Sequence, residues 1–121
     1  MPDLVGFLTA RYDEAATHAR RAAAVAKGGN WTYADGFLGS EGVRSFAQVG
    51  VPFGGHSIAE HIAGHSPARV LADLAAKQRL VDPNTWAGGP ETEDAYRDML
   101  RILAQPYAEH SDYDDAWRID A

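Results

Sequence analysis

The stretch that decides the fold is WTYADGFL, residues 31–38. Aromatic and β-branched residues flank the Asp35-Gly36 pair, and this pair favours a two-residue hairpin turn between two strands. Further along, Gly39-Ser40-Glu41-Gly42 is typical of a second turn, and residues 43–49 alternate apolar and polar side chains. The pattern therefore predicts a small three-stranded antiparallel β meander over residues 31–50.

Helical patterns lie on both sides of this meander. Apolar residues recur at helical spacing from Leu4 to Ala26 behind Asp3, which is a favourable N-cap, and Gly28-Gly29 are expected to supply the left-handed conformations that end this helix. In its second half the apolar positions are almost all alanine, which lets another helix approach closely.

Three more helices are expected after the meander. Ser57 with Glu60 has the spacing of a capping box, Ser66-Pro67 is typical of a helix start, and Thr92 is the expected cap of the last helix. The predicted helices cover residues 3–27, 57–64, 67–81 and 92–105, and a tail follows over 106–121. We therefore predict an α+β fold in which three to four helices pack on the meander, as a single domain over residues 1–121.

Composition excludes several classes of protein. The 121 residues contain no cysteine, so the chain has no disulfide framework, thiolate metal site or cysteine nucleophile. Its apolar runs are much shorter than the roughly 20 residues that span a bilayer, and the N-terminus has no signal-peptide pattern. We expect a cytoplasmic protein with no membrane partner, in the host cytoplasm if a phage encodes it.

The charge is concentrated near the C-terminus. The net charge is −6, and residues 91–121 alone hold nine acidic residues against three arginines. Duplex DNA binding normally requires a concentrated basic face, and the strongest candidate is Arg20-Arg21 with Lys27 on an alanine-rich helix. No nucleic-acid partner is expected.

Three histidines are weak candidates for a metal site. His61 and His65 are four residues apart, so they share a helix face if the helix extends that far, and His56 is near enough to join them. Against this, Gly64 is expected to end the helix before His65, and the His-Glu-x-x-His order is absent. We therefore assign no metal ligand and regard these histidines as structural.

No catalytic constellation is recognisable. The sequence has no Gly-x-Ser-x-Gly, no phosphate-binding glycine loop and no carboxylate pair in an apolar setting, so we predict neither an enzyme nor a cofactor. The aromatic residues of the meander could stack a small ligand, although filling the seam between sheet and helices is the simpler role. These residues are Trp31, Tyr33, Phe37 and Phe46.

The C-terminal segment interleaves aromatic and acidic residues. Its candidate binding residues are Tyr107, Tyr113, Trp117, Asp114 and Asp115. One interpretation is a tail docked on its own chain, with the aromatic rings inside and the acids in water. The other is an exposed surface for a basic partner, with Tyr and Trp as hot spots. Disordered segments are poor in aromatic residues, so we favour docking and expect Trp117 to be more than half buried.

Several segments together carry a resemblance to a known group of proteins. They are Leu4-Val5-Gly6-Phe7-Leu8, Trp31, His61-Ile62-Ala63-x-His65-x-Pro67-Ala68-Arg69-Val70-Leu71, Ala76-Lys77-x-Arg79-x-Val81 and Leu100-Arg101-x-Leu103-Ala104-x-Pro106-Tyr107-Ala108-x-His110-x-Asp112-Tyr113. In these the chain resembles an uncharacterised family of small proteins from actinobacteria and their phages, whose members often lack His56. More loosely, the meander followed by Pro-Ala-x-Val-Leu is similar to Ead-like accessory proteins of temperate phages.

The resemblance implies a phage or prophage accessory protein and carries no activity with it. We therefore predict a non-enzymatic protein-interaction module that acts on a host, defence or phage protein of unknown identity. The alternative is a small-ligand or metal-binding protein that uses His61, His65 and the aromatic residues of the meander. The oligomeric state is not predicted.

Overall fold

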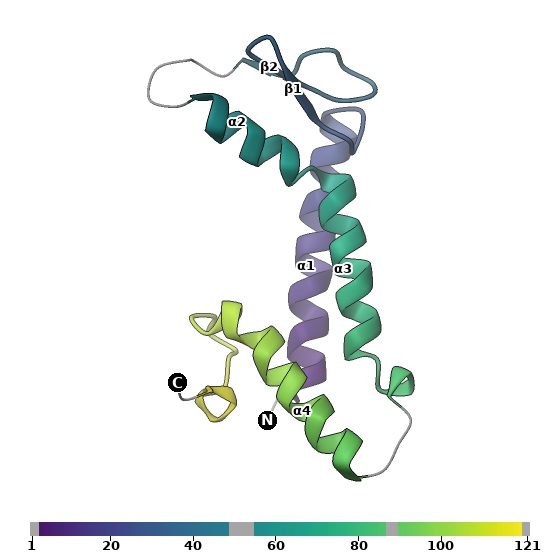
Figure 1. The fold of residues 1–121 in the computed structure, drawn as a ribbon, viewed down its shortest axis with the longest axis vertical. Coiled ribbons are helices and arrows are strands. Elements are labelled where there is room, and N and C mark those ends of the chain that lie inside the picture. The colour runs from purple at the N-terminus through teal and green to yellow at the C-terminus, as the bar shows by residue number, and fades with distance from the viewer. Residues whose placement is uncertain (1–2, 49–54, 87–89, 120–121) are drawn as a thin grey trace. The chain divides into compact units, whose positions relative to one another are not determined.

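The computed structural model describes residues 3–48, 55–86 and 90–119 (Figure 1). Its α-helices are α1 (Leu4–Val25), α2 (Gly55–Gly64), α3 (Pro67–Val81) and α4 (Pro90–Ala104). Its strands are β1 (Thr32–Ala34), β2 (Phe37–Gly39) and β3 (Ala47–Gln48), and its short 3-10 helices are η1 (Pro83–Thr85), η2 (Gln105–Tyr107) and η3 (Asp115–Trp117). The strands form one antiparallel sheet in the order β1-β2-β3, so the predicted α+β class is confirmed.

The chain divides into two compact units. Unit 1 consists of residues 1–13 and 76–121, and unit 2 consists of residues 14–75. The sheet and α2 belong to unit 2, and α4 belongs to unit 1. The single domain expected over residues 1–121 stays a prediction.

The hairpin forms as its sequence predicts. Ala34 pairs with Phe37, and the two residues between them, Asp35 and Gly36, have φ values of 52° and 84°. Two left-handed residues in succession define the type I′ turn, whose twist matches that of the strands. In the same unit, α2 contacts β1, so the sheet is supported by a helix (Figure 1).

The third strand is shorter than predicted. It covers Ala47–Gln48 instead of starting near residue 43, and the predicted residues 49 and 50 lie outside the described part of the chain. The Ser40 N–H donates to the Val43 carbonyl at 2.8 Å, which forms a turn where a strand was expected. The chain then passes so close to Gly39 that a Cβ there would lie 2.2 Å from the Arg44 carbonyl oxygen. Alternation alone could not reveal this close approach.

The end of α1 corrects another expectation. The left-handed residue is Lys27, with φ 56°, and neither Gly28 nor Gly29 has a positive φ. The Gly28 N–H donates to the Ala23 carbonyl at 2.8 Å and the Lys27 N–H to the Ala24 carbonyl at 3.3 Å, which is a Schellman motif.

The two glycines instead let neighbouring segments pack closely. A Cβ on Gly28 would lie 2.7 Å from the Glu41 Oε1 atom, and one on Gly29 would lie 3.3 Å from the Ala68 nitrogen. The Glu41 carboxylate accepts from the Asn30 backbone N–H at 2.6 Å and from the Asn30 side chain at 3.2 Å. These bonds, led by the backbone one, hold the pKa of Glu41 below its ordinary value. The end of α1 is thus fastened to the loop after β2.

The remaining helices deviate from prediction mainly at their starts. α3 has the predicted bounds, whereas α2 begins at Gly55 and α4 at Pro90, two residues before the expected Ser57 and Thr92. Proline fits the first turn of a helix without losing a hydrogen bond, so α4 begins there and Thr92 lies inside its first turn. α4 ends at Ala104, because Pro106 cannot continue it.

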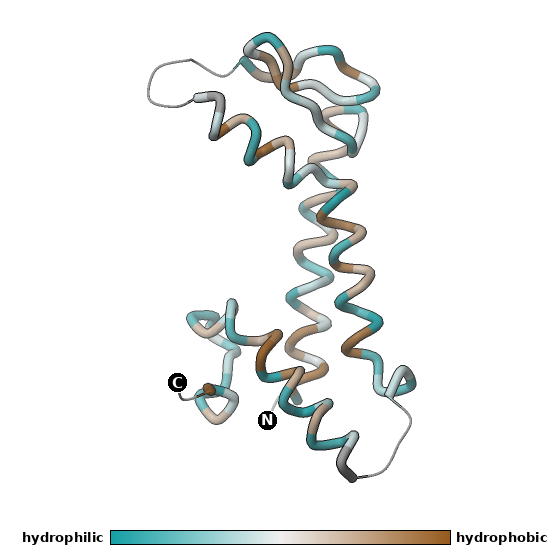
Figure 2. Tube along the Cα trace, viewed as in Figure 1, coloured by the Kyte–Doolittle hydropathy of each residue, from teal (hydrophilic) through white to brown (hydrophobic). Residues whose placement is uncertain are grey.

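Both units contain buried apolar residues, and Figure 2 shows where hydrophobic and hydrophilic residues lie along the Cα trace. In unit 2 the buried apolar residues are Ala16, Ala19, Ala26, Leu38, Ala59 and Leu74. In unit 1 they are Phe7, Leu8, Tyr12, Val81, Leu100, Ala104 and Trp117. The burial of alanine along the second half of α1 agrees with its expected role as a close-packing face.

We expect Lys27→Gly to stabilise the protein by about 0.5–1 kcal/mol, because glycine adopts the left-handed conformation without the steric cost that a side chain pays. Urea unfolding measures the change. Asp35→Gly, at the other non-glycine residue with a positive φ, should also stabilise the protein. A lower free energy of unfolding for Lys27→Gly than for the natural protein would contradict this steric cost at residue 27.

Candidate binding site in unit 1

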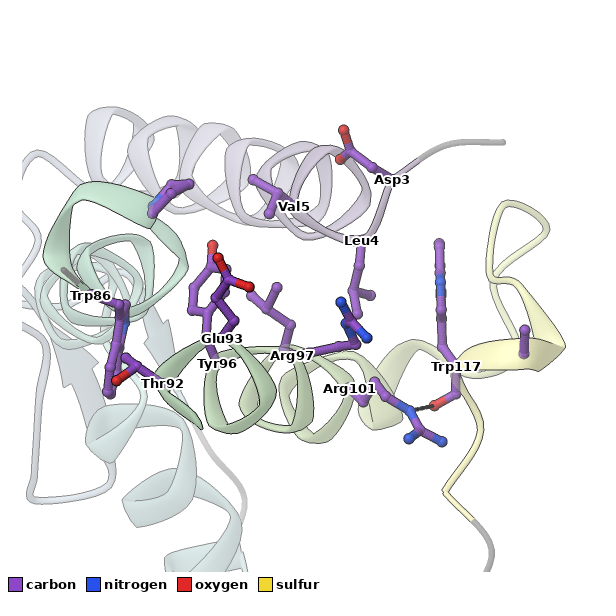
Figure 3. Close-up of a pocket in the computed structure, with 13 residues that line it drawn as sticks. Asp3, Leu4, Val5, Trp86, Thr92, Glu93, Tyr96, Arg97, Arg101 and Trp117 are labelled. Atoms are coloured by element: carbon purple, nitrogen blue, oxygen red, sulfur yellow. Dashed lines mark hydrogen bonds between the residues drawn. The ribbon is translucent and has the colours of Figure 1, made fainter. Parts of the chain in front are cut away.

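The site begins at the first turn of α1. Asp3 Oδ1 accepts a hydrogen bond from the Gly6 N–H at 2.5 Å, so Asp3 is the N-cap that the sequence predicts. This cap starts the helix where Leu4 and Val5 face α4 (Figure 3). Phe7 follows about one turn further along α1.

Phe7 is the centre of an aromatic cluster that holds the C-terminal segment. Its ring centroid lies 5.0 Å from that of Trp117, and three more rings from the same segment surround it. These are Tyr107 at 6.2 Å, His110 at 5.7 Å and Tyr113 at 6.0 Å, all with edge-to-face geometry. Trp117 is only 7 % exposed, so the expectation that it is more than half buried in a docked segment is confirmed.

Arg11 completes this cluster, and the sequence analysis missed it. The side chain is 8 % exposed, and its guanidinium carbon lies 5.1 Å from the centroid of the Phe7 ring. Its Nη1 atom donates to the His110 ring, 2.7 Å from Nδ1, and lies 3.9 Å from the carboxylate of Asp112. The signal was available, because Arg11 is one turn after Phe7 on the apolar stripe of α1.

Two side chains of α4 hold the backbone of the same segment. Arg101 donates to the carbonyl oxygens of Trp117 at 3.3 Å and Arg118 at 2.8 Å. Gln105 donates to the Trp117 carbonyl and to the Tyr113 hydroxyl, each at 3.1 Å. The C-terminal segment is therefore fixed both by its rings and by its carbonyl groups.

The predicted binding residues separate into an inner and an outer set. The rings of Tyr107, Tyr113 and Trp117 pack around Phe7, and the two tyrosines are half-buried. Asp114 caps η3 by accepting from the Ala116 N–H at 2.9 Å, and the exposed Asp115 pairs with Arg118 at 3.2 Å. The two aspartates thus stabilise the local conformation of the segment, and the aromatic rings hold the segment against Phe7.

Docking of this segment forms one wall of a pocket. The pocket has a volume of about 900 Å³, and its lining comes from α1, η1, α4 and η3 of unit 1. The side chains at its lining include Leu4, Val5, Trp86, Glu93, Tyr96, Arg97, Leu100 and Trp117. In Figure 3, Tyr96 and Arg97 project from α4 toward Leu4 and Val5, with Trp86 at one end and Trp117 at the other. Of these residues, only Trp117 is a binding residue that the sequence predicts.

Tyr96 connects the pocket to the end of α3. Its hydroxyl donates to the Val81 carbonyl, so α4 is tied to the residue where α3 ends. Burial raises the pKa of the Tyr96 phenol, and the negative charges of Asp82 and Asp3 raise this pKa further. The neutral phenol is therefore the form that the folded state favours.

The other candidate residues lie in unit 2. His61 and His65 are both exposed, and their ring centroids lie 4.2 Å apart, so the structure brings this pair together. The side chain of His56 is outside the described part, and no group of three or more potential ligands occurs among the described residues. Trp31 and Phe46 pack against each other at 4.9 Å, and the Trp31 indole donates to the Gly28 carbonyl.

We expect Trp117→Ala to destabilise the protein by about 3–5 kcal/mol, because it removes a buried ring from the aromatic cluster. Ile119→Ala is the matched control on the same segment, and its exposed side chain should contribute little. Denaturant unfolding compares the two variants. Equal midpoints for Trp117→Ala and the natural protein would contradict the docked arrangement.

Tyr96→Phe tests the phenol. At neutral pH we expect a loss of about 0.5–1.5 kcal/mol from the missing hydrogen bond. Because the pKa of Tyr96 is raised in the folded protein, the phenol ionises at a lower pH in the unfolded chain than in the folded one. The stabilisation that Tyr96 provides is therefore complete below about pH 10 and is lost as the pH rises through the raised pKa. The difference between the two proteins in free energy of unfolding should therefore shrink between pH 9 and pH 11. A difference that stays constant across this range would argue against the raised pKa.

Among the described residues, no helix is long and apolar enough to cross a membrane.

Comparisons with known proteins place the chain in a family. No curated protein and no solved structure matches the chain. Residues 1–119 match the family of unknown function DUF6221, which confirms the expected membership of an uncharacterised family. The chain therefore belongs to DUF6221.

Proposed function

We propose that the protein is a non-enzymatic interaction module and that the pocket of unit 1 binds a segment of a partner protein. The observation that carries the proposal is the pocket itself, in which the rings of Trp86, Tyr96 and Trp117 line one hollow of about 900 Å³. Trp and Tyr are the residues most enriched at hot spots, because they offer a large apolar surface together with a polar group.

Charge supports a basic partner. Unit 1 has twelve acidic residues against six Lys and Arg, a net charge of −6, whereas unit 2 has five of each and is neutral. The whole imbalance of the chain is thus on the unit that contains the pocket. A field of this sign attracts a positively charged segment and speeds its association at low salt.

The expected occupant combines an apolar side chain with a Lys or Arg. The apolar side chain would contact Leu4, Val5 and Leu100, and the cation would meet Glu93, which is exposed on α4 at the pocket. Arg101 is already engaged by backbone carbonyl groups, so it competes little for the acidic groups of the pocket. Arg97 also lines the pocket, which holds Asp3 and Glu93 beside the two arginines, so the preference for a cationic segment rests on the net charge of unit 1.

The proposed phage origin and the proposed non-enzymatic role are both supported by the sequence. The resemblance to actinobacterial and phage proteins supports a phage or prophage accessory protein that acts on a host or defence protein in the cytoplasm. The lack of a recognisable catalytic motif supports a non-enzymatic role. The alternative, a small-ligand or metal-binding protein, would place its site at His61 and His65 with the aromatic residues of the sheet, and the close pair of imidazole rings favours it.

A two-step experiment tests the protein-interaction proposal. A photo-crosslinking amino acid at Trp86, which is 36 % exposed, captures the partner, and the same amino acid at Ile58 of α2 is the control in unit 2. Binding of the purified partner is then measured for Glu93→Lys and for Glu60→Lys, two charge reversals at exposed helix positions in different units.

We expect capture from position 86 only, and at least tenfold weaker binding for Glu93→Lys with no change for Glu60→Lys. A partner that binds both variants equally well, or one that is captured equally from both positions, would contradict binding at the pocket.

A further inference from the structure

Two imidazole rings lie together at the surface of unit 2. His61 is in the last turn of α2, and His65 follows its final residue, Gly64. Their ring centroids are 4.2 Å apart with the planes tilted by 33°, and both residues are exposed. The expectation that Gly64 separates His65 from the helix is correct for the helix boundary, yet the His65 ring turns back over His61.

A backbone hydrogen bond fixes the His65 ring in this position. Its Nδ1 atom lies 2.7 Å from the carbonyl oxygen of His61, and a carbonyl can only accept, so Nδ1 carries the proton. In the neutral ring this leaves the lone pair on Nε2, where it is available to a metal ion. In metal sites, the ring nitrogen that does not bind the metal commonly donates to a carboxylate, a backbone carbonyl or water, and this bond orients the ring.

The spacing suits one ion held by two nitrogen atoms. Zinc-like ions bind imidazole nitrogen at about 2.0–2.1 Å, so two ligands on one ion lie about 3 Å apart. The two ring centroids lie 4.2 Å apart, and the exposed His61 side chain can rotate to bring one of its nitrogen atoms to an ion held by Nε2 of His65. No described carboxylate or third histidine completes the set, which leaves the other coordination positions to water.

We infer that His61 and His65 chelate one divalent late transition-metal ion per chain. Imidazole prefers Ni²⁺, Cu²⁺ and Zn²⁺, whereas Mg²⁺ requires oxygen ligands, so the site discriminates between these ions. This inference deepens the metal-binding alternative given under the proposed function. It does not use the pocket in unit 1, so failure of either site leaves the other intact.

Calorimetric titration with Ni²⁺, and with Mg²⁺ as the negative control, tests the site on the full-length protein. We expect one Ni²⁺ per chain, and at least tenfold weaker binding for His61→Ala and for His65→Ala. His18→Ala removes an exposed histidine of α1 in the same unit and should leave the affinity unchanged. All three side chains are exposed, so circular dichroism should show that the variants fold like the natural protein.

Three results would overturn the inference. The first is an unchanged affinity in either His61→Ala or His65→Ala, and the second is an equal loss in His18→Ala. The third is one ion for two chains with a doubled mass in sedimentation, because it would mean that two copies share the ion and the pair within one chain is insufficient.

Discussion

The contact on which unit 1 depends is the packing of the Phe7 ring against Trp117. The two residues are separated by most of the chain, and they join the first turns of α1 to the C-terminal segment at a centroid distance of 5.0 Å. Four rings around one phenylalanine bury a large apolar surface in a small volume. Because Trp117 is at once part of this cluster and part of the pocket lining, the wall of the candidate site exists only while the segment is docked.

Unit 2 depends on a different constraint, the close approach of backbone segments. Its strands contain two or three residues each, too few to be stable without support. The loop after β2 instead contacts the end of α1 directly: the Ser40 hydroxyl donates to the Ala26 carbonyl, and a Cβ on Gly42 would lie 2.0 Å from the Lys27 carbonyl oxygen. Glycine is needed here to let one segment lie against another.

These two constraints explain what the sequence could and could not predict. Local chemistry was sufficient for the type I′ turn at Asp35-Gly36 and for the start of α3 at Pro67, because those signals act within a few residues. It failed at Gly28-Gly29, where a glycine pair that resembles a helix cap instead meets Glu41 and Ala68. The aromatic spacing of the C-terminal segment correctly predicted burial of Trp117. The burial of Arg11 was indicated by its place one turn after Phe7 on α1. The partners of Phe7 and Arg11 were not, since nothing local links these residues to a segment about a hundred residues away.

The candidate site was predictable to the same limited extent. Trp117 was identified, but the pocket also requires Leu4, Trp86 and Tyr96 from three other parts of the chain, and only the fold brings them together. The concentration of acidic residues near the C-terminus was visible in the sequence, and the division into units places the full net charge with the pocket.

The central claim is that the C-terminal segment docks on Phe7 and thereby builds the site. Nuclear Overhauser effects between the ring protons of Phe7 and the indole protons of Trp117 test it most directly, with the full-length protein in solution. At a centroid distance of 5.0 Å we predict strong cross-peaks, together with ring-current shifts of the Phe7 protons. Absence of these cross-peaks, with random-coil shifts for residues 106–119, would contradict it.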